Sequence, residues 1–253
     1  MSIEKTFDSK SAEILKAGEI FKRKEGFPKV VIGTFSQKNL DVILDGRRYQ
    51  SVAKLDFGQE GALVYKVFDD EIGQFGLFYC HLGGAAVAAQ LEEVIAMGGE
   101  KFIIYGSCGC LVQGIEAGSI VVPTAAYRDE GTSYHYMEPS DFVHIEDNEK
   151  CVKIIESLGV KPLITKVWTT DALYRETEEN LRKRKELGCK VVDMECASMA
   201  AVTKFRDVSF MQFLYIEDNL DGEQWDPGLL GKFTKTHRQQ YAMVALEIAK
   251  ELV

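Results

Sequence analysis

The stretch KFIIYGSCG, residues 101–109, decides the fold class of this chain. Its first half is apolar and β-branched or aromatic, which is typical of a strand, and we expect that strand over 101–107. The preceding residues 83–99 form an Ala-rich stretch that ends in a glycine pair, as helices often do. A helix followed directly by such a strand is the repeating unit of an α/β fold.

Strands and helices alternate on both sides of this stretch. Apolar, β-branched runs predict further strands at 30–35, 61–68, 74–82, 118–127, 162–170, 189–195 and 208–218. Amphipathic or charged stretches predict helices at 148–158, 176–188 and 196–205, followed by a C-terminal helix. No internal repeat or change in composition marks a boundary. The sequence therefore predicts a single α/β domain over residues 1–253 with a mostly parallel sheet.

The composition is that of an ordinary folded domain, with 46% hydrophobic and 27% charged residues. The net charge of −9 is repelled by phosphate backbones, so we expect no nucleic-acid partner. No apolar stretch approaches the roughly 18 residues of a membrane-spanning helix. The start MSIEKTFDSKSAEIL lacks the basic and then apolar pattern of a signal peptide. We therefore expect a cytoplasmic protein that makes no membrane contact.

The six cysteines predict neither a disulfide framework nor a metal site. Several of them, including Cys80 and Cys196, lie in apolar runs, where a free cysteine behaves as a small hydrophobic residue. Cys108 and Cys110 form a C-x-C pair, but no second cluster stands at zinc-ligand spacing. We expect no bound metal.

The carboxyl ends of the predicted strands are where a parallel α/β sheet binds its ligand. Small residues alternate with carboxylates at these ends and lysine is absent from them; the segments are 81–84, 106–109, 128–136, 169–171, 193–195 and 217–219. This composition suits a neutral, polyhydroxylated ligand or general acid chemistry. It does not suit a nucleoside triphosphate, because the G-x-x-x-x-G-K pattern is missing.

Three of these strand ends carry candidate site residues. Gly106 and Ser107 have two equally good interpretations: donors that hold an anion or a ribose oxygen, or a tight turn that needs glycine. Met194 and Glu195 favour a sugar site, since a carboxylate accepts two hydroxyl bonds and Met offers an apolar floor; acids in a first helical turn are the alternative. Asp218 is either a proton donor with a raised pKa or part of a turn.

Read in order, GSCG, GSIVVPTAAYRDEGTSYHY, VWTTDALYRET, VVDMECASMAA and YIEDNLDGEQWD resemble the nucleoside phosphorylase family. This family includes hexameric purine nucleoside phosphorylases, uridine phosphorylases and methylthioadenosine nucleosidases. The resemblance covers roughly residues 75–225 as an ordered set of motifs. It implies a single α/β domain around a mixed, twisted, barrel-like sheet flanked by helices. It also implies a homo-oligomer, either a dimer or a hexamer built as a trimer of dimers.

The resemblance assigns a role to each candidate. Met194 and Glu195 match the residues that hold the ribose, and Ser107, with Gly106, matches the residues that position phosphate. Asp218 matches the aspartate that protonates or hydrogen-bonds the purine ring, and Tyr174 falls in the segment on the side of the base. Thr177 and Glu179 stand where uridine phosphorylases carry the Gln and Arg that bind uracil, which favours a purine.

Two phosphate-binding arginines of the family are missing from this sequence. The Gly-Asp-Pro-x-Arg loop is replaced by residues 33–38, GTFSQK, and the arginine before the GSCG motif is replaced by Ile104. The N-terminal histidine that a neighbouring subunit lends to the ribose 5′-hydroxyl is also absent, because the first histidine is His81. The cations that are candidates to compensate are Lys38, Arg47, Arg48 and Arg128.

The function that we expect is cleavage of the N-glycosidic bond of a nucleoside. Phosphorolysis of a purine nucleoside to free base and ribose 1-phosphate ranks first, with phosphate as co-substrate and no metal or organic cofactor. A hydrolytic nucleosidase is the runner-up, because the missing arginines matter less if water is the nucleophile. A uridine phosphorylase and a nucleoside-binding protein without catalytic activity are further alternatives.

Overall fold

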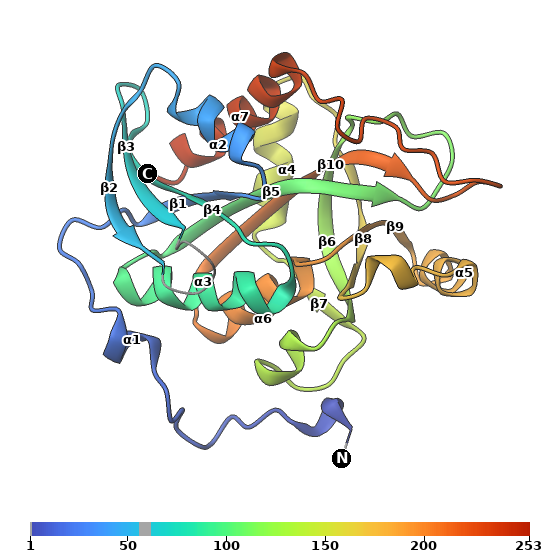
Figure 1. Ribbon diagram of the computed structural model, residues 1–253, viewed down its shortest axis with the longest axis horizontal. Helices are drawn as coiled ribbons and strands as arrows, with labels where there is room; N and C mark the ends of the chain where they lie inside the picture. Colours follow the sequence, from blue (N-terminus) through green and yellow to red (C-terminus); the bar gives the residue numbers. More distant parts are fainter. Residues whose placement is uncertain (1, 56–61) are drawn as a thin grey trace.

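Ten strands form one mixed sheet in the computed structural model, which describes residues 2–55 and 62–253 (Figure 1). The strands are β1 (Val30–Thr34), β2 (Arg48–Lys54), β3 (Leu63–Asp69), β4 (Gly73–Tyr79), β5 (Lys101–Cys110), β6 (Ile120–Asp129), β7 (Phe142–His144), β8 (Leu163–Thr170), β9 (Cys189–Asp193) and β10 (Ser209–Asn219). Their order is β10-β6-β8-β9-β5-β1-β4-β3-β2, and β7 pairs with β6.

Five of these strands close into a barrel. Strand β10 pairs with β6 at one end of the order and also with β5, so that β10, β6, β8, β9 and β5 form a ring. The contact between β5 and β9 consists of two antiparallel residue pairs, Gly109 with Val192 and Cys110 with Val191. Beyond the ring, β1 and β4 continue the sheet in parallel, and β3 and β2 extend it antiparallel.

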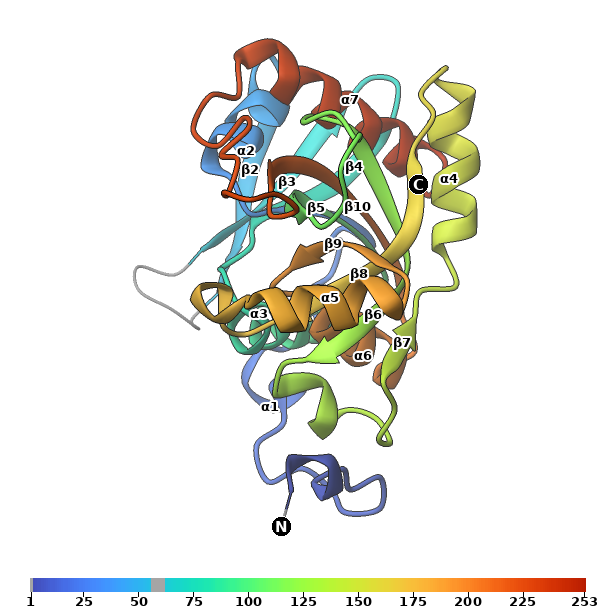
Figure 2. The same ribbon diagram turned by 90° about the vertical axis from the view of Figure 1, so that its right-hand side faces the viewer.

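Helices cover both faces of the sheet, as Figures 1 and 2 show. Helices α3 (Gly84–Met97) and α6 (Cys196–Phe205) lie on one face, and α2 (Gln37–Leu44), α4 (Asn148–Ser157) and α7 (Lys235–Lys250) lie on the other. Helix α5 (Glu178–Glu186) packs beside β9, and the short α1 (Ala17–Ile20) lies near α3. Short 3-10 turns occur at Ile3–Lys5, Thr132–His135 and Leu173–Arg175.

The side chains of β5 explain why both faces need a cover. Phe102 and Ile104 belong to the core under α3 and α6, whereas Ile103 and Tyr105 belong to the core under α2 and α7. Successive side chains of a strand point to opposite faces, so an unbroken apolar run requires helices on both sides.

The α/β class, the single domain and the barrel-like mixed sheet are confirmed. The helix predicted at 196–205 has those limits, and most other predicted elements agree to within about two residues. The strand predicted at 61–68 is observed as Leu63–Asp69, and Gly61 lies outside the described residues. Helix α2 and strands β2 and β7 were not predicted.

The predicted end of the central strand at 107 is wrong. Strand β5 continues to Cys110, so Gly106 and Ser107 lie within a strand and not in a turn. Gly106 is required for space and not for a turn, because a Cβ atom there would lie 2.8 Å from Cδ2 of Phe35.

Within residues 2–55 and 62–253, no helix has both the length and the apolar character that crossing a bilayer requires.

Candidate functional site

Strand β5 has an unpaired stretch of edge at its carboxyl end. Along one edge it pairs with β10 over its whole length, from Lys101 to Cys110. Along the other edge β1 pairs with residues 101–105 and β9 pairs only with residues 109–110. Gly106, Ser107 and Cys108 therefore have no strand partner on that edge among the described strands. We call these three residues the open edge of β5; strands that diverge at their carboxyl ends are where α/β sheets bind ligands.

Glu195 lies in the turn from β9 into α6, three residues after Val192, which pairs with Gly109 next to the open edge. The residue is only 6% exposed, and its carboxylate accepts a hydrogen bond from the backbone N–H of Gly83, at 2.7 Å. Gly83 has φ +94°, a conformation that favours glycine, and it joins β4 to α3. Burial, and secondly the charge of Asp193, raise the pKa of Glu195. The adjacent Met194 is partly exposed.

The neighbouring Asp193 has a structural role. One of its oxygens accepts the hydroxyl of Thr169 at 2.7 Å, and the other accepts the backbone N–H of Cys196 at 2.8 Å. The second bond satisfies a free donor at the N-terminus of α6. These two bonds tie Asp193 to the turn, whereas Glu195 is held through Oε1 by Gly83 and can accept further hydrogen bonds, because a carboxylate accepts about four.

Asp218 approaches the same region from β10. In the strand register it lies opposite Gly109, which pairs with Val192 of β9 on its other side. The carboxylate accepts the indole N–H of Trp225 at 2.6 Å. Burial raises the pKa of Asp218, and the Trp225 bond opposes this rise. Gly109 makes room for the carboxylate, since a Cβ atom there would lie 3.1 Å from Oδ1 of Asp218.

Glu176 is a fourth acidic group that the sequence analysis did not assign to the site. It follows the 3-10 turn Leu173–Arg175 after β8 and is partly buried. Burial, and secondly the charge of Asp218, raise its pKa to about 7. The sequence held one signal for this residue, because Glu176 lies two residues after Tyr174 in the segment that the resemblance places on the side of the base. The Tyr174 side chain itself is 92% exposed, so its role in binding the base stays a prediction.

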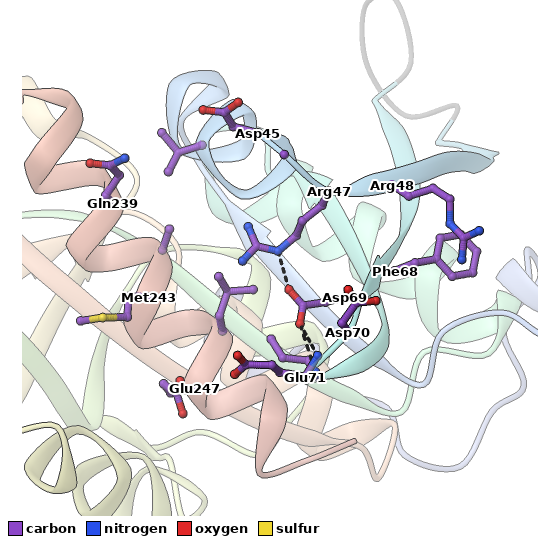
Figure 3. A pocket seen from close by; sticks show the side chains of 15 residues that line it. Asp45, Arg47, Arg48, Phe68, Asp69, Asp70, Glu71, Gln239, Met243 and Glu247 are labelled. Carbon is purple, nitrogen blue, oxygen red and sulfur yellow. Dashed lines mark hydrogen bonds and ion pairs between the residues drawn. The ribbon is translucent and has the colours of Figure 1, made fainter.

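Three of the four candidate replacement cations form contacts with residues outside the open edge; they are Arg47, Arg48 and Arg128. Arg47 and Arg48 line a surface hollow of about 920 Å³ between α2, α7 and the β3–β4 turn, at the amino end of β4 (Figure 3). There Arg47 bonds Asp69 at 2.6 Å, and the Arg48 guanidinium lies 4.6 Å from the centre of the Phe68 ring.

The other two candidates differ in their surroundings. Arg128 is 3% exposed, donates to Ser133 at 2.7 Å and lies over the Tyr134 ring. Lys38 is exposed on α2. None of the four therefore has a contact that links it to Ser107 in the described part of the chain.

No group of three or more His, Cys, Asp or Glu side chains among the described residues is arranged to hold a metal ion. All six cysteines are free and buried.

Three comparisons relate this geometry to known proteins. The family model of the phosphorylase superfamily matches residues 64–253. A guanosine phosphorylase of Halorubrum lacusprofundi is 26% identical over 165 residues, which are 62% of this chain and 66% of that protein. A uridine phosphorylase of Thermococcus kodakarensis is 38% identical over 96 residues, which are 37% of this chain and 34% of that protein.

The fold has a solved counterpart. The purine nucleoside phosphorylase from Toxoplasma gondii in complex with immucillin-H superimposes with a TM-score of 0.74 at 18% sequence identity, covering 89% of this chain and 91% of that one. The match to the family model confirms, at the level of the family, the resemblance inferred from the motifs. Because the family model matches about three quarters of its length, this chain belongs to the phosphorylase superfamily.

Proposed function

We propose that this protein is a nucleoside phosphorylase that cleaves a purine nucleoside to free base and ribose 1-phosphate. The observation that carries the proposal is the convergence of three groups on one short segment of β5. Ser107 lies in the open edge, Asp218 lies opposite Gly109 on β10, and Glu195 follows the β9 residues that pair with Gly109 on its other side.

The reaction exchanges one bond at the sugar. A phosphate oxygen held at Ser107 forms a bond to C1′ of the ribose, and the C1′–N bond breaks with its electron pair going to the base. Glu195 accepts hydrogen bonds from the ribose hydroxyls and fixes the sugar over Met194. Asp218 donates a proton to the departing base and is reprotonated from the hydrogen phosphate or solvent. General acid catalysis of this kind contributes about 10²- to 10⁴-fold in rate.

The base that fits best is a 6-oxopurine, the class of guanine and hypoxanthine. Such a base has an N–H donor at N1, and guanine adds an exocyclic amino group. The Glu176 carboxylate is a suitable acceptor for these donors, while Asp218 serves an acceptor nitrogen of the ring. The relative described as a guanosine phosphorylase supports this choice.

The test is base release from guanosine, inosine, adenosine and uridine, each with and without phosphate. We expect guanine and hypoxanthine to be released only when phosphate is present, together with ribose 1-phosphate. Release of uracil in preference to purines would contradict the proposed base.

Hydrolysis is the second candidate, because neither Ile104 nor the loop of residues 33–38 supplies an arginine. Equal base release with and without phosphate would establish it. Tight nucleoside binding with no release under either condition would indicate a binding protein.

A further inference from the structure

Arg238, in the second turn of α7, contacts the loop where the resemblance expects a phosphate-binding cation. Its Nη1 donates to Oγ of Ser36 at 3.0 Å and to Oδ1 of Asn39 at 2.9 Å. Ser36 caps the N-terminus of α2 and follows the carboxyl end of β1. The loop itself carries no arginine, but Arg238 from the other end of the chain lies beside it.

Arg238 differs in its partners from three other arginines that are withdrawn from solvent, although the buried Arg128 also bonds neutral groups, the hydroxyl of Ser133 among them. Arg47, Arg184 and Arg206 each bond a carboxylate. Within residues 2–55 and 62–253, Arg238 forms no ion pair, and both groups that it bonds are neutral. A partly buried charge is normally paired, because desolvation is costly. Arg238 lies beside the loop that follows the carboxyl end of β1, so its guanidinium is placed where an anionic ligand could neutralise it.

Two chains of contacts connect Arg238 with the open edge of β5. Asn39 also donates to the hydroxyl of Tyr215 at 3.2 Å, and Tyr215 lies opposite Ser107 in the β10–β5 pairing. Phe35, adjacent to Ser36, lies against Gly106, as its 2.8 Å distance from a Cβ placed there shows. Along the first of these chains, the side chains of Asn39 and Tyr215 lie between Arg238 and the strand position of Ser107.

We propose that Arg238 binds the phosphate nucleophile together with Ser107 and replaces the arginines missing from the family's phosphate site. This inference rests on the proposed function. Ser36 and Asn39 orient the guanidinium through Nη1. Its Nε and Nη2 donors have no hydrogen bond within the described part of the chain, so they are available for a two-pronged bond to an oxyanion.

The test compares the wild type with Arg238→Gln, Arg238→Lys and the control Lys235→Gln, which changes an exposed cation of the same helix. Kinetics with guanosine give separate KM values for inorganic phosphate and for the nucleoside. Thermal unfolding with and without phosphate measures binding independently of turnover. We expect Arg238→Gln to raise the phosphate KM roughly 10- to 100-fold, as loss of a charged hydrogen bond does, with little change in the guanosine KM.

Two further results are expected if the inference is right. Arg238→Lys recovers part of the phosphate affinity, because it keeps the charge and loses the planar fork. Phosphate raises the Tm of the wild type and of Lys235→Gln, and raises that of Arg238→Gln much less.

Several outcomes would overturn the inference. A phosphate KM that is unchanged in Arg238→Gln removes Arg238 from the phosphate site while the proposed phosphorolysis stands. Equal loss for both substrates, with a lower Tm in the absence of phosphate, assigns Arg238 a structural role between α7 and α2. A selective loss of affinity for guanosine 5′-monophosphate, with the affinity for inorganic phosphate retained, places the charge at the substrate's own phosphate. A wild type that cleaves guanosine equally without phosphate, and is not stabilised by it, refutes the proposed phosphorolysis and this inference together.

Discussion

At the scale of single residues, Asp218 is half-buried and accepts one hydrogen bond from the indole of Trp225. Burial favours its protonated form, which a proton donor to the base requires. We expect Asp218→Asn to lower kcat for guanosine by about 10²- to 10⁴-fold with little change in KM.

Steady-state kinetics measure this effect, and Asp221→Asn is the matched control, since Asp221 follows β10 three residues after Asp218 and pairs with Lys185. Unchanged turnover in Asp218→Asn would remove this residue from the mechanism.

Glu176 predicts a pH dependence, because its pKa is raised to about 7. Its carboxylate accepts hydrogen bonds from a 6-oxopurine best when ionised, so the KM for guanosine should fall as pH rises through about 7. Glu176→Gln should abolish that pH dependence and raise the KM at pH 8. A KM profile that is the same in both proteins would exclude Glu176 from the base site.

The same shift has the opposite consequence for stability. The folded pKa of Glu176 is about 7 and its ordinary value is 4.5, so folding favours the protonated form. That contribution is fully present below pH 4.5 and is lost as pH rises through about 7. The Tm of the wild type should therefore decrease between pH 4.5 and about 7 by an amount that Glu176→Gln does not show. This difference would show that Glu176 itself titrates.

At the scale of elements, Gly109 lies where three strands meet. A Cβ atom there would lie 2.7 Å from Leu220, 3.0 Å from Val192 and 3.1 Å from Asp218. We expect Gly109→Ala to lower the free energy of unfolding by about 1–3 kcal/mol, as overpacking does, and to reduce kcat by displacing Asp218. Denaturant unfolding measures the first effect. Gly18→Ala is the control, since a Cβ at Gly18 has nothing within 4 Å; equal stability of the two variants would contradict the close packing.

Helices and strands with a sustained apolar pattern or a clear termination signal were predictable from the sequence. The helix 196–205 follows a buried Val-Val strand, and α3 ends at a glycine pair. Helix α2 was missed because it has only eight residues and its single start signal is the Ser36 cap. The end of β5 was misplaced because glycines that make room for Phe35 look in sequence like glycines that make a turn.

The site was predictable only in part, for a related reason. Residues at strand ends can be read from local patterns: Ser107 lies in β5, Asp218 lies opposite Gly109, and Glu195 follows the strand whose Val192 pairs with Gly109, while the roles of these residues stay predictions. Partners from distant segments have no local signature. The charged stretch 176–188 predicted a helix but gave no sign that its Arg184 is only 9% exposed and lies 3.9 Å from the Tyr127 ring centre. Arg238 was not considered because about 200 residues separate it in sequence from the loop of residues 33–38, and only folding brings the two together.

At the scale of the whole molecule, the predicted homo-oligomer is open to a direct test. The N-terminal segment carries adjacent apolar side chains in solvent, Ile14 at 103% and Leu15 at 75% exposed. Exposed apolar groups of this kind favour burial against another chain. We expect light scattering to give the mass of a dimer or hexamer, and the double variant Ile14→Ser, Leu15→Ser to shift it downward. A monomeric wild type would contradict this prediction.

The barrel is joined between β5 and β9 by two residue pairs, whereas β10 and β5 pair over ten. The β10–β6 junction of the ring also has two residue pairs, but the β5–β9 junction is the one next to the open edge that holds Ser107 and to the turn that holds Glu195. Local opening there should cost less free energy than opening the ten-pair contact between β10 and β5, so amide protons that bond across the β5–β9 junction should exchange with solvent faster than those between β10 and β5. A nucleoside held by Glu195 and a phosphate held at Ser107 would bridge the two sides of this junction. Bound substrate would then add contacts across a junction that the backbone closes with only two residue pairs. Binding could therefore be followed as slower amide exchange at this junction.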